Sequence, residues 1–322
     1  MTIIAQVVQT PVGTGSTLLQ LVQQATGELG LTKPSAVATS TAQDTIQQLA
    51  LLNAVGYEAI IGNKDVAPFN WQALTTEYRF TSQWVQYTGT VTQGSPFVTG
   101  LSSTSGITAG TYMVTGTGIP QDCYVVSVQG NSQVTLSQNA TSSGTGLLTF
   151  AQTKYAMPSD YKRLIDRTQW DKSKHWEMLG PESPQQWQWL KSGYIATGPR
   201  IRWRILGSYF QIWPAVSTSE YLGFEYISSN WVRDANGNPK SSFTADTDTC
   251  IFDDRMMVLG LKLKYWEIKG FDTTSLKADF DAVVSALQGQ EQAAPMLSFA
   301  PRLSQVLLGP ENIPDSNYGV AQ

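Results

Sequence analysis

Residues 200–213 read RIRWRILGSYFQIW, and this stretch decides the fold of the middle of the chain. Arginines alternate with apolar side chains as far as Ile205, so an extended strand would send the two sets to opposite faces. Gly207-Ser208 suits a two-residue hairpin turn, and apolar residues resume at Tyr209. The pattern predicts a β-hairpin with one charged face and one buried face.

The sequence on both sides of this hairpin, residues 154–232, is also typical of strands. Another strand is predicted from Tyr221 to Trp231, followed by a turn at residues 234–237 (DANG). A short helix from Gln185 to Lys191, behind Pro184, interrupts the strands. We therefore expect a small antiparallel β-sheet here.

The preceding segment has a very different composition. Asp122 is the only charged residue from Thr81 to Gln152, and Thr, Ser, Gly and Val dominate. Runs such as YVVSV at 124–128 and QVTLS at 133–137 alternate between turn signals, which predicts a small all-β module. The alternative is a disordered Ser/Thr/Gly linker, but the regular alternation of apolar residues favours the module.

Helices are predicted at both ends of the folded part. The first runs over residues 16–29, with Ser16 as N-cap, and the second starts near Thr41 in a capping-box-like pattern with Asp44. A third, residues 251–269, is apolar on most of its circumference, which is typical of a large core or a subunit interface. A fourth starts after Asp272.

The expected fold class is α+β: a helical bundle formed by the N-terminal and C-terminal helix pairs, a small antiparallel β-sheet and an inserted all-β domain. The expected parts are an N-terminal extension and helix pair (1–82), the inserted all-β module (83–152), the sheet with the C-terminal helix pair (153–294) and an extended tail (295–322).

Composition narrows the possible functions. The 322 residues carry a net charge of −4, and only 14% are charged, so a basic nucleic-acid footprint is absent at whole-chain level. The two cysteines, Cys123 and Cys250, have no motif spacing and are expected to be buried free thiols. We find no apolar run of membrane-spanning length and no signal peptide, and expect a cytoplasm-like compartment.

Catalytic signatures are scarce. The single histidine, His175, is expected to be structural or exposed. Four acidic residues before the third helix could form a cation site or a glycosidase-like carboxylate pair, but turns and compensation of the helix dipole are the favoured interpretation. These residues are Asp246, Asp248, Asp253 and Asp254. Residues 234–238 begin like a calcium loop, but their glycine is misplaced, so we interpret them as a turn. We predict no enzyme, and no catalytic, cofactor-binding or metal-binding residue.

Two other segments are candidates for contacts with partners. Arg200, Arg202 and Arg204 could touch a polyanion, although a solvated face or ion pairs with a neighbouring subunit are favoured. Four prolines exclude a continuous helix after residue 294, yet the tail is apolar and is expected to strap onto its own domain or a partner. Its apolar residues are Met296, Leu297, Phe299, Leu303, Val306, Leu307 and Leu308.

The segments on either side of the insert, taken together, resemble the head-to-tail adaptor (connector) proteins of tailed bacteriophages. The residues that carry the resemblance are, in order, WQAL at 71–74, YAMPSDYKR at 155–163, LGPESP at 179–184, FEY at 224–226, NWV at 230–232, FTADTDT at 243–249 and KGFD at 269–272. The insert is similar to a β module of phage particle proteins, through SGITAG at 105–110, GTGIP at 116–120 and VTLS at 134–137. Adaptors of this family generally lack such an insert.

The resemblance implies a structural virion protein, made in the host cytoplasm and located in the neck of the particle. It implies a ring of about twelve copies between portal and tail tube or nozzle. Double-stranded DNA would pass without sequence-specific contacts, no membrane would be involved, and the tail from Pro295 to Gln322 would dock on the portal protein. Two rivals remain: a particle-surface binding or decoration protein acting through the insert, and a cell-wall-degrading virion protein.

Overall fold

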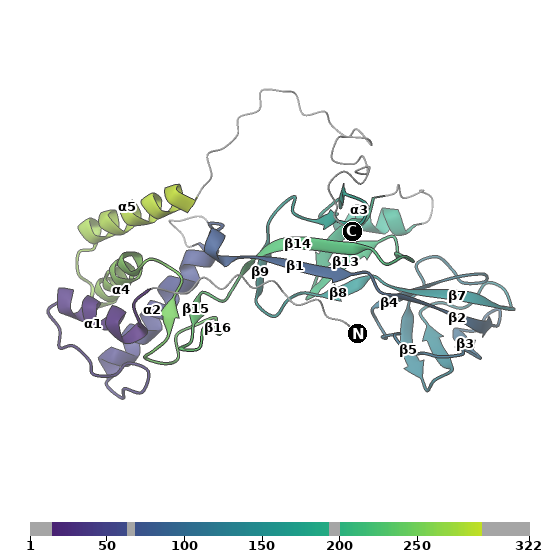
Figure 1. Cartoon of the computed structure of the whole chain (residues 1–322), viewed down its shortest axis with the longest axis horizontal. Coiled ribbons are helices and arrows are strands. Elements are labelled where there is room, and N and C mark those ends of the chain that lie inside the picture. Colours follow the sequence, from purple (N-terminus) through teal and green to yellow (C-terminus); the bar gives the residue numbers. More distant parts are fainter. Residues whose placement is uncertain (1–14, 63–67, 193–199, 292–322) are drawn as a thin grey trace, which may run out of the picture.

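The computed structural model describes residues 15–62, 68–192 and 200–291. The molecule is elongated, with three parts in a row (Figure 1). Four helices and short strands occupy one end, antiparallel sheets the middle, and a β module the other end. The helices of the described part are α1 (Leu18–Glu28), α2 (Gln43–Ile61), α3 (Pro184–Lys191), α4 (Asp254–Lys269) and α5 (Thr274–Glu291), with a 3-10 turn at Gln72–Leu74.

The strands form four antiparallel sheets. The first contains β1 (Thr75–Thr81), β14 (Tyr221–Ser228), β10 (Trp170–Asp171) and β11 (Trp176–Glu177) in that order, with β9 (Tyr161–Leu164) also on β14. The second has the order β12 (Arg202–Leu206), β13 (Tyr209–Trp213), β8 (Lys154–Ala156). The third has the order β16 (Pro239–Lys240), β15 (Val232–Arg233), β17 (Thr249–Cys250). The module has the order β4 (Tyr112–Thr115), β7 (Gly144–Gln152), β2 (Trp84–Val91), β3 (Phe97–Thr99), β6 (Gln133–Leu136), β5 (Val125–Gln129).

The predicted helical bundle is wrong. The described residues form a mixed but strand-rich fold, with five helices against 17 strands, and the helices lie mostly towards the ends of the chain. The helices do not close a core by themselves, because Trp231, Val232 and Phe243 from the strand region complete it. The five predicted helices are present, but the sequence reasoning underestimated the strands, because strands of only a few residues leave a weak pattern.

The helix boundaries follow from capping groups. Thr17, rather than the predicted Ser16, caps α1: its hydroxyl accepts from the Gln20 N–H, and the Gln20 side chain accepts from the Thr17 N–H. The predicted capping box of α2 is also wrong, because Ala42 is the N-cap and makes no side-chain bond. Asp253 caps α4, and Gly270 ends it with a φ of 76°.

The helical end packs around Trp231, which is 1% exposed. A Cβ on Gly56 of α2 would lie 2.2 Å from the Trp231 ring, so only glycine allows this approach. Trp231 explains why β14 stops at Ser228 instead of continuing as predicted: the chain turns there and enters the helical core.

Arg163 joins the helical end to the middle. Its guanidinium donates to the carbonyl of Ile60 at the end of α2, over 2.5 Å, and also to the Phe69 carbonyl. Two further bonds reach the side chain of Asn70, at 3.0 and 2.8 Å. Because charged hydrogen bonds are stronger than neutral ones, this one side chain holds three segments together.

The predicted hairpin is confirmed in the middle of the molecule. Strands β12 and β13 pair from Arg202↔Trp213 to Leu206↔Tyr209, and Gly207 has a φ of 59° in the turn. Phe210 stacks on Phe224 at 4.9 Å between ring centroids, so two sheets share one aromatic core. The predicted short helix is also confirmed as α3, capped by Ser183.

The β module has its own apolar core, which includes Val98, Cys123, Leu148 and Phe150. The chain enters it directly from β1 into β2 and leaves it directly from β7 into β8. A small cluster of Met113, Trp187, Leu190 and Trp213 packs the module against α3 and β13.

Candidate interaction surfaces

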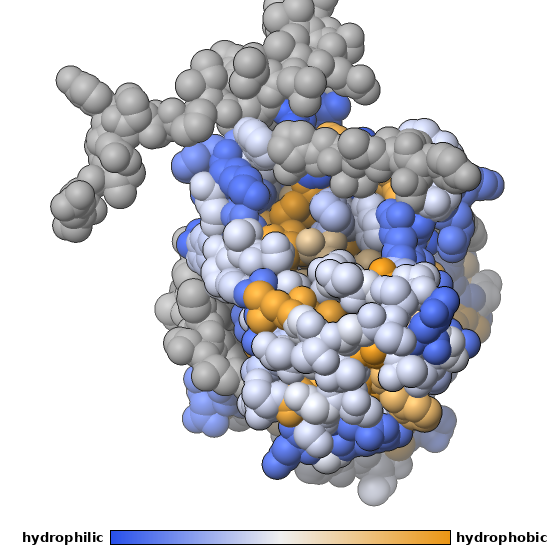
Figure 2. All heavy atoms as spheres, turned by 90° about the vertical axis from the view of Figure 1, so that its right-hand side faces the viewer, coloured by the Kyte–Doolittle hydropathy of each residue, from blue (hydrophilic) through white to orange (hydrophobic). Residues whose placement is uncertain are grey.

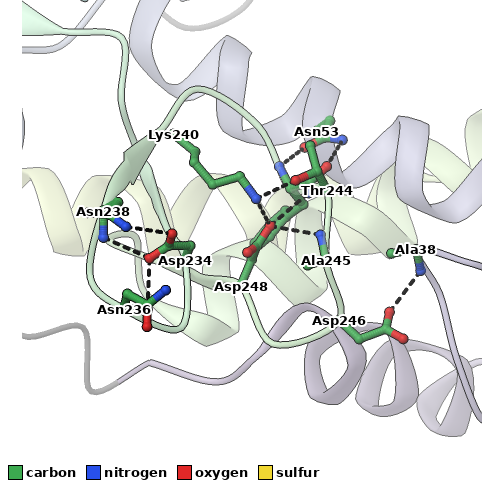
Figure 3. A network of polar contacts seen from close by, with 11 residues as sticks. Ala38, Asn53, Asp234, Asn236, Asn238, Lys240, Thr244, Ala245, Asp246 and Asp248 are labelled. Carbon is green, nitrogen blue, oxygen red and sulfur yellow. Dashed lines mark hydrogen bonds and ion pairs between the residues drawn. The ribbon is translucent and has the colours of Figure 1, made fainter.

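The acidic segment before α4 is used to hold the chain itself (Figure 3). The Asp248 carboxylate is buried and accepts from the N–H groups of Thr244 (2.8 Å) and Ala245 (2.9 Å), and from Lys240 over 2.5 Å. Burial alone would raise the pKa of Asp248, but these bonds outweigh it, so its pKa lies below the usual value. Asp246 accepts from the N–H of Ala38 at 2.8 Å, which fastens the loop between α1 and α2.

The other two acids also bind main-chain groups. Asp253 accepts from the N–H groups of Arg255 (2.8 Å) and Met256 (3.2 Å), as an N-cap does. Asp254 accepts from the N–H of Ser16 (3.0 Å) and from its hydroxyl (2.5 Å), and so ties the start of α1 to α4. These bonds are the ones expected of turns and helix-end charges, the interpretation favoured for this segment.

The loop at residues 234–238 is a turn, as predicted. Asp234 accepts from the N–H groups of Asn236 and Asn238, each at 2.8 Å, and from the Asn238 amide (Figure 3). These bonds from Asn238 hold the pKa of Asp234 below its usual range. Within residues 15–62, 68–192 and 200–291, no group of three His, Cys, Asp or Glu side chains is placed to hold a metal ion.

Arg202 and Arg204 lie on strand β12, as predicted, and both have partners inside the chain. Arg202 pairs with Glu182 at 2.5 Å. Arg204 donates to Gln211 at 3.1 Å and lies 4.5 Å from the Trp187 ring centroid, and burial lowers its pKa. Arg200 lies just before β12 and is half-buried. Two of the three arginines thus help to fix α3 and the loop before it against the sheet.

The remaining predicted residues divide into three groups. The seven apolar tail residues, Met296 to Leu308, lie outside the described residues. His175 is exposed, as expected, in a turn between β10 and β11. Both cysteines are buried free thiols, and burial raises the pKa of Cys250 to about 12.

An exposed apolar patch lies at the end of α4 and was not predicted. Ile268 is 56% exposed and Phe271 61% exposed. Gly270 reverses the chain so that the Phe271 N–H donates to the Trp266 carbonyl at 3.1 Å, and the two aromatic rings meet edge to face at 6.0 Å. We call Trp266 and Phe271 the α4 tip; Ile268 lies two positions after Trp266 and therefore on the opposite side of the helix. The predicted apolar helix is thus buried along its first part, from Met256 to Leu261, and after that only at Tyr265.

The far end of the molecule has a different surface. Figure 2 views the β module end on and shows mostly residues of intermediate hydropathy, with scattered blue and orange side chains. Four large apolar residues of the module are exposed: Phe97 (42%), Tyr124 (42%), Val126 (50%) and Leu147 (58%). This surface is nearly free of charge, because Asp122 is the only charged residue in the segment.

Sequence reasoning missed a polar hollow of about 700 Å³ at the junction of helices and sheets. Arg233 lies in its wall, is 8% exposed, and has no hydrogen-bond partner for Nε or Nη1 among the described residues. The pKa of Arg233 lies below its usual value, because desolvation lowers it by more than the nearby Asp160 raises it. Asp160 accepts instead from Tyr226 (2.8 Å) and Ser228 (2.7 Å). The sequence feature that could have indicated this buried arginine is its position directly after the apolar pair Trp231-Val232.

Comparison with known proteins assigns neither a family nor a function to this chain. No protein family model matches the chain, and no curated protein matches it. No helix among the described residues is both long and apolar enough to cross a membrane.

Proposed function

We propose that this chain is a structural head-to-tail adaptor of a tailed-phage virion. About twelve copies form a ring between the portal and the tail and extend the channel through which DNA passes. The sequence resemblance supports this proposal through the order of its segments, not through the predicted helical bundle.

The α4 tip is the observation that carries the proposal. Phe271 is 61% exposed and its ring meets that of the half-buried Trp266 edge to face. An exposed aromatic pair of this kind is typical of surfaces that a partner covers. In a closed ring, each copy would cover this patch with a different surface of its neighbour.

Native mass spectrometry with and without the portal protein tests the proposal. We expect a monomer or small oligomer alone, and about twelve copies on the portal. Phe271→Asp should prevent the ring, because it places a charge in the proposed contact. Leu147→Asp is the matched control, since Leu147 is similarly exposed (58%) but lies in the β module. A monomer in the presence of portal, or equal loss of the ring in both variants, contradicts the proposal.

A second function is favoured by the exposed apolar residues of the module. Tyr124, Val126 and Leu147 could bind a host envelope or capsid surface while the rest of the chain anchors the module. Binding of the whole chain to host envelopes, lost in Tyr124→Ser and kept in Phe271→Asp, would support this alternative. Binding unaffected by the module variant would exclude it.

A further inference from the structure

An apolar groove of about 370 Å³ lies between α2, α4 and α5. Its wall is mainly apolar and includes Ala59, Trp71, Met256, Leu263 and Phe280, together with the charged residues Glu58, Lys264, Glu267 and Lys277. The groove exists because α5 is incompletely packed: of its residues only Leu276 and Val284 are buried, while Phe280, Val283 and Leu287 are half-buried. A helix with an apolar stripe normally buries that stripe against a neighbour. Part of the apolar surface of α5 therefore remains uncovered by the described residues.

The chain continues beyond α5 from the end of this groove. The Gln72 N–H donates to the Glu291 carboxylate at 2.8 Å, and the Gln72 amide donates to the Glu291 carbonyl at 2.5 Å. Gln72 directly follows Trp71 of the groove wall, and Gln288, one turn before Glu291, is also in the wall. The described part of the chain therefore ends beside the groove at Glu291, which two hydrogen bonds hold in place.

The first part of the following segment has the right length and chemistry to fill the groove. Met296, Leu297 and Phe299 follow Glu291 by five to eight residues, so an extended chain reaches roughly 17–26 Å. Along α5 the groove wall extends from Gln288 back to Lys277, which is roughly 16 Å of helix. Pro295 and Pro301 exclude a continuous helix, which leaves the segment free to run back along the groove.

We propose that residues 295–300 of the same chain occupy this groove in the unassembled protein, with Met296, Leu297 and Phe299 against its apolar wall. Docking covers the free face of α5 and keeps an apolar segment out of water. This inference concerns the free chain and does not depend on the proposed adaptor function. If the tail also binds the portal, the two sites compete for the same residues, so assembly includes release of the segment.

Cysteine pairs in the full-length chain test the placement. Leu263 is half-buried in the groove wall, so Leu263→Cys with Phe299→Cys should form a disulfide within one chain under mild oxidation. Leu147→Cys with Phe299→Cys is the matched control and should not. The two natural cysteines are 0% and 2% exposed, so they should not compete. Equal crosslinking in both pairs, or a Leu263 crosslink only between two copies, overturns the proposal.

Hydrogen exchange supplies an independent readout. Serine in place of Met296, Leu297 and Phe299 changes only the segment beyond α5, so the variant should fold. We expect amide exchange over residues 276–288 to become at least severalfold faster when the segment no longer covers α5. Unchanged exchange in α5 overturns the proposal. The result is separable from the adaptor function, because the experiment contains no portal.

Discussion

The Lys191 ammonium at the end of α3 lies 2.7 Å from the carboxylate of Asp122 in the β module. Asp122 is the only charged residue between Thr81 and Gln152, so the module's one charge is used where it meets the middle of the molecule. Next to this ion pair, Leu190 and Trp187 of α3 pack against Met113 of the module. A polar contact and an apolar cluster together fix the module to the middle.

The apolar cluster should contribute more to this contact than the ion pair. Leu190→Ala removes a side chain that is 1% exposed and should lower the free energy of unfolding by about 2–4 kcal/mol. Asp122→Asn should cost less than about 1 kcal/mol, because both partners are partly exposed. Chemical denaturation of both variants measures the difference. A larger loss for Asp122→Asn would contradict this ranking.

Gly56→Ala should be strongly destabilising although alanine is the better helix former. The added Cβ would lie 2.2 Å from the Trp231 ring, and relieving the overlap should cost about 1–3 kcal/mol. Gly289→Ala is the matched control: it is also helical, nothing lies within 4 Å of its added Cβ, and it should stabilise by about 0.5–1 kcal/mol. If both substitutions changed the melting temperature in the same direction, the Trp231 ring would not be what requires glycine at position 56.

Asp248 should make stability depend on acid pH. Its pKa is lowered in the folded state by the bonds from Lys240, Thr244 and Ala245, which outweigh burial. A lowered folded pKa stabilises the fold above the ordinary aspartate pKa, near 4, and this contribution is lost as pH falls through the folded value. At about pH 7 the Asp248→Asn variant should have a lower free energy of unfolding than the unchanged protein. Between about pH 7 and pH 3, denaturation should show that this free energy falls less in the variant than in the unchanged protein. Parallel curves for the two proteins would contradict this role.

Arg202 and Arg200 should have different roles, the first in the stability of the fold and the second in contact with a neighbouring copy. Arg202→Gln leaves Glu182, which is 9% exposed, without its ionic partner and should cost about 1–3 kcal/mol. If Arg200 makes that contact, Arg200→Gln should weaken ring formation on the portal without changing the melting temperature. Thermal melts and native mass spectrometry of the two variants give the two readouts. Normal ring formation by Arg200→Gln would exclude Arg200 from the interface.

Local pattern was sufficient for individual elements. The hairpin of β12 and β13, the helix α3 behind its proline and the turn at residues 234–238 could be predicted because neighbouring residues alone determine them. The same holds for the end of α4 at Lys269, where Gly270 takes the left-handed conformation, whereas the predicted start at residue 251 was three residues early. In each case, the stabilising group lies within a few positions of what it stabilises.

Only the tertiary structure decided how these elements combine. In the antiparallel pairing of β1 with β14, Glu77 lies opposite Glu225, and no local signal in the sequence specifies so distant a strand partner. The buried Arg233 and the exposed Phe271 show the same limit, because burial depends on what packs against a residue from elsewhere in the chain. Sequence by itself thus determined the local elements and the near absence of charge in the insert. The strand-rich architecture, the internal use of the acidic residues and the surfaces left open followed from long-range packing.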